Sequence, residues 1–356
     1  MEKKYIKNLS LDETENLFKV LQINPERAKE LFTWIYEKNT ADFHEINIFP
    51  LKIRKFLAEN YELSPLVAEK VQQSSDGTIK ILLKTEDDLY IETVLIPNRQ
   101  KSKIRYTVCI SSQAGCAMGC SFCQTAKTGF KRNLQTAEIL DQINHIRRIS
   151  GIKNNNVVFM GMGEPFNNYD SVIKAAEIMN YTFGFHLSNY KITVSTCGIF
   201  DGIRKFVEQK KPFNLAISLN DTDMEKRRLN MPVEKKYPFS EIINYLKIHL
   251  PSSKNRVLIE YIMRADNISE SDALRLKEII FSEKILLNCI VLNQGDHNFQ
   301  IPDSSAVELF LQYLDNLKIT YTLRESYGSD ISAACGQLSA SILQHNHKKP
   351  FQKATV

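Results

Sequence analysis

The stretch Cys109-Ile-Ser-Ser-Gln-Ala-Gly-Cys116-Ala-Met-Gly-Cys120-Ser-Phe-Cys123 decides how this chain folds and which chemistry it can support. Three thiolates in its short loop can each bond a different iron of a [4Fe–4S] cube, which leaves the fourth iron open to chelate a substrate. Structural zinc is the alternative, but it commonly takes four ligands in two Cys-x-x-Cys pairs. The chain has no second pair. Ligand count and spacing therefore favour a cluster over zinc.

Beyond residue 105, apolar strand candidates alternate with helical stretches. The strands are expected at 107–111, 156–160, 191–196, 213–219, 256–262, 288–292 and 320–324. The helices are expected at 137–149, 171–179, 239–250, 270–281 and 304–317. Alternation of this kind indicates a parallel sheet covered by helices, as an open or partial (β/α) barrel, with the chemistry at the carboxyl ends of the strands.

The residues before this repeat have a different pattern. Apolar residues at helical spacing predict short helices near the N-terminus, and the alternating segments at 78–83 and 89–94 predict hairpin strands. We thus expect an α/β protein divided into a helical accessory domain (1–62), a β-hairpin extension (63–104), a barrel core (105–342) and a polar tail (343–356).

The composition is that of an ordinary globular protein, with 43% hydrophobic and 24% charged residues. A net charge of +5 suits an anionic partner such as RNA, but it is weak evidence. No apolar run resembles a secretory signal or the roughly 18–20 residues of a membrane span. We therefore expect a cytoplasmic protein with no membrane partner, in which metal binding or catalysis explains the seven cysteines better than structural disulfides do.

The spacing Cys-x-x-x-Cys-x-x-Cys, with an aromatic residue before the last cysteine, resembles the signature of the radical SAM superfamily. The resemblance implies that Cys116, Cys120 and Cys123 hold a [4Fe–4S] cluster, and that S-adenosylmethionine (SAM) binds its open iron and is cleaved to a 5′-deoxyadenosyl radical. The turn around Gly163 and Glu164 fits, because glycine allows close backbone approach and a carboxylate can accept from the methionine ammonium. A tight strand-to-helix connection would look the same.

Four motifs narrow the resemblance, over nearly the whole chain, to the RlmN/Cfr family of radical SAM RNA methyltransferases. They are Cys109-Ile-Ser-Ser-Gln, Gly129-Phe-Lys-Arg-Asn-Leu134, Met160–Pro165 and Ala333-Ala-Cys335-Gly-Gln-Leu338. The cluster loop is more similar to the RlmN branch, which implies methylation of C2 of adenosine 2503 in 23S rRNA, and of adenosine 37 of certain tRNAs in some bacteria. Two alternatives stay open: Cfr-like methylation of C8, and a metal-containing RNA-binding protein without turnover.

The family resemblance also implies residue roles. Cys335 matches the methyl-carrying cysteine, and Cys109 matches the thiol that releases the product through a transient disulfide. Glu92 matches the proton acceptor, although the strand pattern alone makes it an outward-facing glutamate. Further SAM contacts match at Ser195, Ser218, Leu219, Asn220 and Asn293. Cys197 and Cys289 have no motif around them and are expected in the core.

The chain departs from the family pattern at three positions. Asn220 stands where the family has histidine, so no acid–base role is expected there. Asn293 lacks its usual proline-rich context, and Ser332 replaces an aspartate. An electron donor such as flavodoxin and a monomeric state are also expected. Basic residues that could contact RNA phosphates are Arg105, Lys127, Lys131, Arg132 and the run Lys226-Arg227-Arg228, although each alone is typical of a solvated surface charge.

Overall fold

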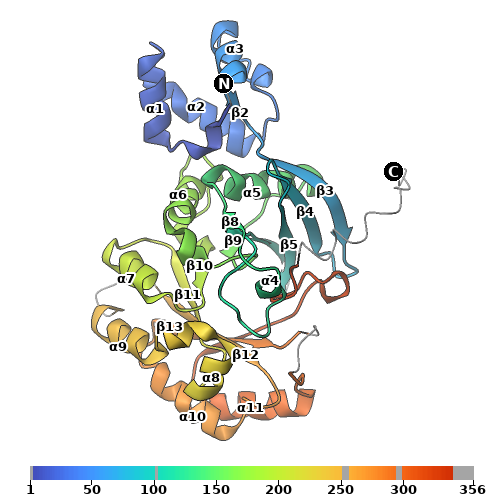
Figure 1. Ribbon diagram of the computed structural model, residues 1–356, viewed down its shortest axis with the longest axis vertical. Coiled ribbons are helices and arrows are strands. Elements are labelled where there is room, and N and C mark those ends of the chain that lie inside the picture. Colours follow the sequence, from blue (N-terminus) through green and yellow to red (C-terminus); the bar gives the residue numbers. More distant parts are fainter. Residues whose placement is uncertain (1–2, 101–102, 251–255, 294–298, 340–356) are drawn as a thin grey trace.

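The computed structural model describes residues 3–100, 103–250, 256–293 and 299–339. A ten-stranded sheet runs through the molecule in the order β14-β13-β12-β11-β10-β9-β6-β5-β4-β3 (Figure 1). Its strands are β3 (Leu66–Gln73), β4 (Ile79–Thr85), β5 (Tyr90–Gln100), β6 (Lys103–Cys109), β9 (Asn156–Phe159), β10 (Ile192–Thr196), β11 (Asn214–Ser218), β12 (Val257–Met263), β13 (Ile285–Val291) and β14 (Tyr321–Arg324).

In this sheet, neighbouring strands pair in parallel from β6 through β9, β10, β11, β12 and β13 to β14. On the other side of β6, the pairs β6–β5, β5–β4 and β4–β3 are antiparallel. Within the described ranges β14 and β3 form the two edges, so the sheet is open and does not close into a barrel. The expected α/β class with a partial-barrel core is confirmed. The β-hairpin strands belong to the same sheet as the core strands.

Helices cover the parallel strands where the sequence pattern predicts them. These helices are α5 (Thr136–Ser150), α6 (Tyr169–Asn180), α9 (Phe239–His249), α10 (Glu270–Ile279) and α11 (Ser304–Asn316). Two further helices, α7 (Phe200–Glu208) and α8 (Met224–Asn230), were not predicted. Helix α8 has few apolar residues and begins at Asp223, whose side chain caps it by accepting from the backbone N–H groups of Glu225 and Lys226.

The N-terminal helices α1 (Leu11–Val20), α2 (Ala28–Phe32) and α3 (Leu51–Asn60) lie together at one end of the molecule (Figure 1). A buried ion pair fastens this end to the core, because Lys7 Nζ lies 2.6 Å from Asp141 Oδ1 on α5. Ser64 donates a hydrogen bond to the other carboxylate oxygen of Asp141 at 2.6 Å. The proposed domain limits stay a prediction, and the tail at 343–356 lies outside the described residues.

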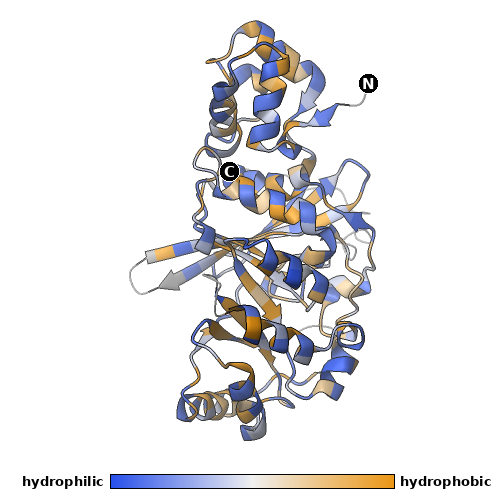
Figure 2. Ribbon diagram, turned by 90° about the vertical axis from the view of Figure 1, so that its left-hand side faces the viewer, coloured by the Kyte–Doolittle hydropathy of each residue, from blue (hydrophilic) through white to orange (hydrophobic). Residues whose placement is uncertain are grey.

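Apolar residues concentrate on the central strands, while the helices are striped with polar and apolar residues (Figure 2). Every residue of β10 is buried, as expected for a parallel strand with both faces covered. Among the described helices, none has the length and apolar character that crossing a membrane requires. Because the parallel strands share one direction, the loops after β6, β9, β10, β11, β13 and β14 all emerge at the same edge of the sheet.

Candidate active site

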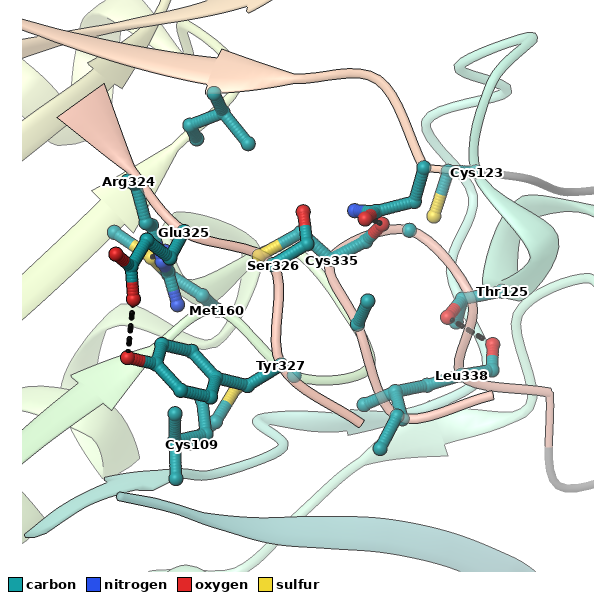
Figure 3. Close-up of a pocket in the computed structure, with 17 residues that line it drawn as sticks. Cys109, Cys123, Thr125, Met160, Arg324, Glu325, Ser326, Tyr327, Cys335 and Leu338 are labelled. Carbon is teal, nitrogen blue, oxygen red and sulfur yellow. Dashed lines mark hydrogen bonds between the residues drawn. The ribbon is translucent and has the colours of Figure 1, made fainter. Parts of the chain in front are cut away.

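A pocket at this edge brings together most of the residues that the sequence predicts for the cluster and for SAM. Its lining includes Cys116, Cys120, Cys123, Gly163, Glu164, Ser195, Ser218 and Asn220. A second pocket lies beside it and is lined by Cys109, Tyr327 and Leu338, among others (Figure 3). Cys335 and Arg324 line both pockets. The loop that carries Cys335 therefore lies between the two.

The three cysteines of the cluster loop are free thiols that are partly exposed to the pocket. Burial, with a smaller contribution from the neighbouring Cys123, raises the pKa of Cys116 to about 12. Burial, followed by the charges of Cys123 and Cys116, also raises the pKa of Cys120. Mutually repelling thiolates are a donor set that positive iron would stabilise.

Across the described ranges, no three or more His, Cys, Asp or Glu side chains gather tightly enough to hold one metal ion. A cubane makes a different demand, because each thiol binds its own iron and the sulfurs need not converge on one point. The donor chemistry of Cys116, Cys120 and Cys123 therefore fits a cluster better than a single ion.

Glu164 lies in the loop that follows β9 and is held in place by backbone donors. Its buried carboxylate accepts hydrogen bonds from the backbone N–H of Cys197 at 2.8 Å and of Phe166 at 3.0 Å. Burial raises the pKa of Glu164. The preceding Gly163 has φ +100°, and a Cβ there would lie 2.5 Å from the Cβ of Gln113. Only glycine fits this position, which fixes the carboxylate against the pocket wall.

Arg227 ties together the loops that follow β10 and β11. Its Nη2 donates to the carbonyl of Cys197 at 3.0 Å, and its Nη1 donates to the carbonyls of Ser218 (2.9 Å) and Leu219. The guanidinium is fully buried, and its Nε lies 2.7 Å from Glu234 Oε2. The interpretation of Arg227 as an RNA-phosphate contact is therefore wrong, because its charge is enclosed by these acceptors.

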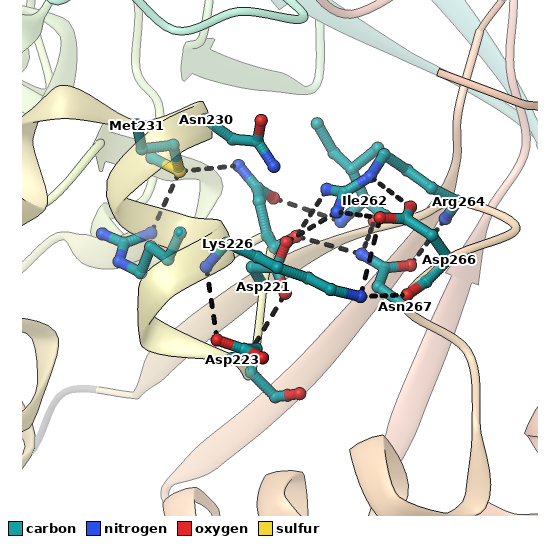
Figure 4. Close-up of polar contacts among 12 residues, drawn as sticks. Asp221, Asp223, Lys226, Asn230, Met231, Ile262, Arg264, Asp266 and Asn267 are labelled. Carbon is teal, nitrogen blue, oxygen red and sulfur yellow. Dashed lines mark hydrogen bonds and ion pairs between the residues drawn. The ribbon is translucent and has the colours of Figure 1, made fainter. Parts of the chain in front are cut away.

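Asn220 is held by a buried polar network, whose members Ile262, Arg264 and Asn267 are labelled in Figure 4. Its side-chain oxygen accepts from the N–H of Ile262 at 3.1 Å. Its carbonyl accepts from Arg264 and Asn267, each at 3.1 Å. Arg264 is fully buried and pairs with Asp221 at 2.6 Å. Asn220 has φ +59°, a left-handed conformation that asparagine tolerates better than most residues, so this backbone geometry accommodates the departure from histidine.

Cys335 and Cys109, far apart in the sequence, line the same pocket. Burial and then the neighbouring Cys335 thiolate raise the pKa of Cys109 to about 12, while Arg324 opposes the shift. Asn293 donates to the carbonyl of Cys335 at 3.3 Å. The short helix α4 (Gln124–Lys127), directly after Cys123, also contacts this loop. Gln124 N donates to Gly336 O at 2.7 Å, and Thr125 Oγ1 donates to Leu338 O at 2.8 Å.

Glu92 is fully buried on β5 and is not an outward-facing strand residue. Its Oε1 lies 3.1 Å from Lys80 Nζ. Its Oε2 accepts from the N–H of Ser339 at 2.8 Å, just after the Cys335 motif. The strand pattern misplaced Glu92 because both faces of the sheet are covered at this point.

Comparison with known proteins places the chain in a family. The model of the radical SAM superfamily matches residues 110–272. A protein of Campylobacter concisus named dual-specificity RNA methyltransferase RlmN is 38% identical, covering 98% of this chain and 93% of that protein. The protein of the same name from Geotalea uraniireducens is also 38% identical, covering 96% and 98%. The crystal structure of a radical SAM methyltransferase from Sphaerobacter thermophilus superposes with a TM-score of 0.87 at 34% identity, covering 95% of this chain and 99% of that one.

The chain belongs to the RlmN family. It is accordingly a SAM-dependent methyltransferase of the radical SAM superfamily, as the cysteine spacing predicts.

Three residues of this RlmN-family site escaped the sequence prediction. Arg324 lies at the end of β14 in the pocket that both thiols line, and the Cys335 thiolate is the main cause of its raised pKa. Glu260 lines the first pocket, its pKa is raised by burial, and its Oε1 has no hydrogen-bond partner in the part of the chain that the structure describes. Cys197 is buried as expected, yet it lies beside Glu164 at the pocket. Position at a strand end was the available signal for Arg324.

The other basic residues near the cluster loop differ in exposure. Arg105, Lys127 and Lys131 are exposed. Arg132 is partly buried between two carboxylates, with its Nη2 2.6 Å from Asp87 and 2.8 Å from Glu138. The charge of Arg132 is therefore compensated by these two carboxylates within the protein. The exposed three stay candidates for phosphate contacts.

Replacing Arg227 by lysine tests how the SAM pocket is held. Lysine keeps the charge but cannot bond several acceptors at once. Loss of a hydrogen bond to a charged group costs about 1.5–3 kcal/mol, so we expect SAM affinity to fall about tenfold or more and the melting temperature to fall. Calorimetric titration of the reconstituted protein measures the affinity. Arg228→Lys, at the exposed neighbouring position, is the control and should bind SAM normally. Equal affinity in a folded Arg227→Lys protein would contradict this role.

Proposed function

We propose that this protein methylates C2 of an adenosine in RNA. The expected target is adenosine 2503 of 23S rRNA, with adenosine 37 of tRNA as a second substrate and a reduced protein such as flavodoxin as electron donor in the cytoplasm. The position of Cys335 carries this proposal, because its loop lies between a pocket suited to SAM and a second pocket lined by Cys109. Relatives named dual-specificity RNA methyltransferases support RNA as the substrate.

Three thiols and several pocket residues would hold the cofactors. Cys116, Cys120 and Cys123 would bind the [4Fe–4S] cluster, while Glu164 would accept from the SAM ammonium and the pocket residues Gly163, Ser195, Ser218 and Asn220 would surround the rest of SAM. Of the other predicted SAM contacts, Leu219 is buried outside the pocket lining and Asn293 lines the neighbouring pocket beside Cys335, so both would act at its border. Bound together, cluster and SAM supply a methyl group and a radical that abstracts hydrogen. The buried carbonyl contacts of Arg227 and Arg264 keep this pocket shaped before SAM arrives.

Cys335 would carry the methyl group, because C2 of adenine is electron-poor and cannot attack a sulfonium as a nucleophile. In the first step the Cys335 sulfur bonds the methyl carbon, the methyl–sulfonium bond breaks, and the thiol proton passes to solvent. In the second step a hydrogen atom passes from that methyl group to the radical derived from SAM. The carbon then bonds C2, which leaves the unpaired electron on the adenine ring. The base is then covalently tied to Cys335. The position of this loop at both pockets suits a residue that must serve both steps.

Release of the product would need Cys109 and a proton acceptor. Glu92 would take the proton from C2, since it is a buried carboxylate held against the Cys335 loop at Ser339. The thiolate sulfur of Cys109 then bonds that of Cys335 as the bond from Cys335 to the product carbon breaks. That carbon takes up a proton to become the methyl group, and the remaining unpaired electron returns to the oxidised electron carrier. Two electrons from a reductant restore both thiols. Arg324, beside both cysteines, favours the thiolate form of Cys109 during this exchange.

Metal analysis separates this proposal from a zinc-containing binding protein. We expect about four irons and four labile sulfides per chain after anaerobic reconstitution. Cys120→Ala should lose most of both, because one iron loses its ligand. Cys289→Ala is the matched control, since Cys289 is buried in β13 away from the pocket lining, and it should keep the cluster. One zinc without sulfide in the unmodified protein would overturn the proposal.

The methylated position is read from the product nucleoside. Incubation of the reduced, reconstituted protein with SAM and either an rRNA fragment or tRNA should yield 2-methyladenosine, identified by mass spectrometry after nuclease digestion. Cys335→Ala should yield none, because the methyl carrier is absent. Formation of 8-methyladenosine alone would show that the Cfr-like alternative is correct.

Replacing Cys109 by alanine tests its releasing role. We expect turnover to stop with RNA covalently attached to Cys335, because no second thiol can displace the product. The adduct would be seen as a slower band on a denaturing gel and mapped by peptide mass spectrometry. The double variant Cys109→Ala/Cys335→Ala should form no adduct. If Cys109→Ala turns over freely, Cys109 is not the releasing thiol.

A further inference from the structure

The loop that carries Cys335 is attached to the β-hairpin extension, whose three antiparallel strands are β3, β4 and β5. At its start, Gly328 N donates to Asp76 Oδ2 at 2.7 Å, and Asp330 Oδ2 accepts from Ser75 N at 3.3 Å. Midway, Lys80 Nζ donates to Ser332 O at 3.0 Å. The far end is held by Glu92. Both ends and the middle of the loop are therefore bound to one hairpin.

Lys80 is the centre of this attachment. Its side chain is only 6% exposed, and the carboxylate of Glu92 that it contacts is 2% exposed. Charges in such surroundings are costly unless each is paired and hydrogen-bonded. Here Glu92 and the carbonyl of Ser332 satisfy Lys80, while Lys80 and the N–H of Ser339 satisfy Glu92. Moving the loop would separate charged groups from their partners.

The turn at the loop's start fits the hairpin equally closely. Gly328 has φ +69°, and a Cβ there would lie 2.8 Å from side-chain atoms of both Thr78 and Ala333. Ser332, whose carbonyl Lys80 contacts, is also in a left-handed conformation (φ +52°). This backbone shape turns the loop toward the hairpin before it reaches Cys335.

We propose that Lys80 is a positioning residue for Cys335. By joining Glu92 to the carbonyl of Ser332, it holds the loop where Cys335 contacts both pockets, and Asp76 secures the same loop at Gly328. The hairpin extension thereby contributes to methyl transfer as well as to any contact with RNA. The catalytic consequence rests on the proposed role of Cys335 as methyl carrier.

Alkylation of Cys335 measures this positioning without requiring turnover. In the folded, reconstituted protein, Lys80→Met should raise the rate of Cys335 modification by iodoacetamide at least fivefold, because the loop is no longer held. Asp76→Ala, in a partly exposed turn, should act in the same direction. Lys80→Arg should restore most of the protection. The control is Lys84→Met, on the same strand as Lys80. It removes the ion pair of Lys84 with the exposed Asp88 and should leave the alkylation rate of Cys335 unchanged.

Two outcomes would overturn the proposal. One is an unchanged alkylation rate in both Lys80→Met and Asp76→Ala. The other is equal acceleration at the buried Cys289, which would show general unfolding instead of loop release. In turnover assays, Lys80→Met should also form more 5′-deoxyadenosine per methylated adenosine, a ratio that a smaller folded fraction leaves unchanged. If the unmodified protein forms no methylated adenosine, the proposed function fails while the alkylation result still decides the role of Lys80.

Discussion

The parallel pairing of the strands from β6 to β14 is the constraint on which the site depends. Parallel strands point the same way, so each following loop emerges at one edge of the sheet. Cys109 and Cys335, which are far apart in the sequence, therefore line one pocket. The main-chain carbonyls of such loops have no partner within a helix or a sheet, and those that are buried need another hydrogen-bond donor. Two buried arginines meet that need: Arg227 donates to three carbonyls, and Arg264 donates to the carbonyl of Asn220.

Periodicity predicted the fold well because the signal is local. The seven core strands and five of the helices were placed within a few residues, since buried parallel strands are short apolar runs and the helices are amphipathic. Helices α7 and α8 were missed. Helix α8 is rich in charge and lacks the apolar spacing that marks a helix. Helix α7 has that spacing, at Phe200, Ile203, Phe206 and Val207, so its sequence did contain the signal.

The motifs predicted the cysteines and the Gly163–Glu164 turn, but not which charges are buried. Arg227 looks the same in the sequence as Arg228, yet one is enclosed and the other exposed. What separates them is Glu234 and three carbonyls that only the tertiary fold brings close. Lys80 and Glu92 are a similar case, because they lie on neighbouring strands with the Cys335 loop packed against them. Burial of charge depends on partners that local patterns do not reveal.

The attachment of the Cys335 loop uses mostly main-chain atoms of that loop. Three of the four contacts use a main-chain group of the loop: the N–H groups of Gly328 and Ser339 and the carbonyl of Ser332. The fourth uses the side chain of Asp330. Peptide groups are the same whatever residue bears them, so most of the loop's side chains can change over evolutionary time while its course is preserved. Ser332, which stands where the family pattern has an aspartate, is one such change. Related sequences can therefore differ along this loop and still present the residue at position 335 in the same way.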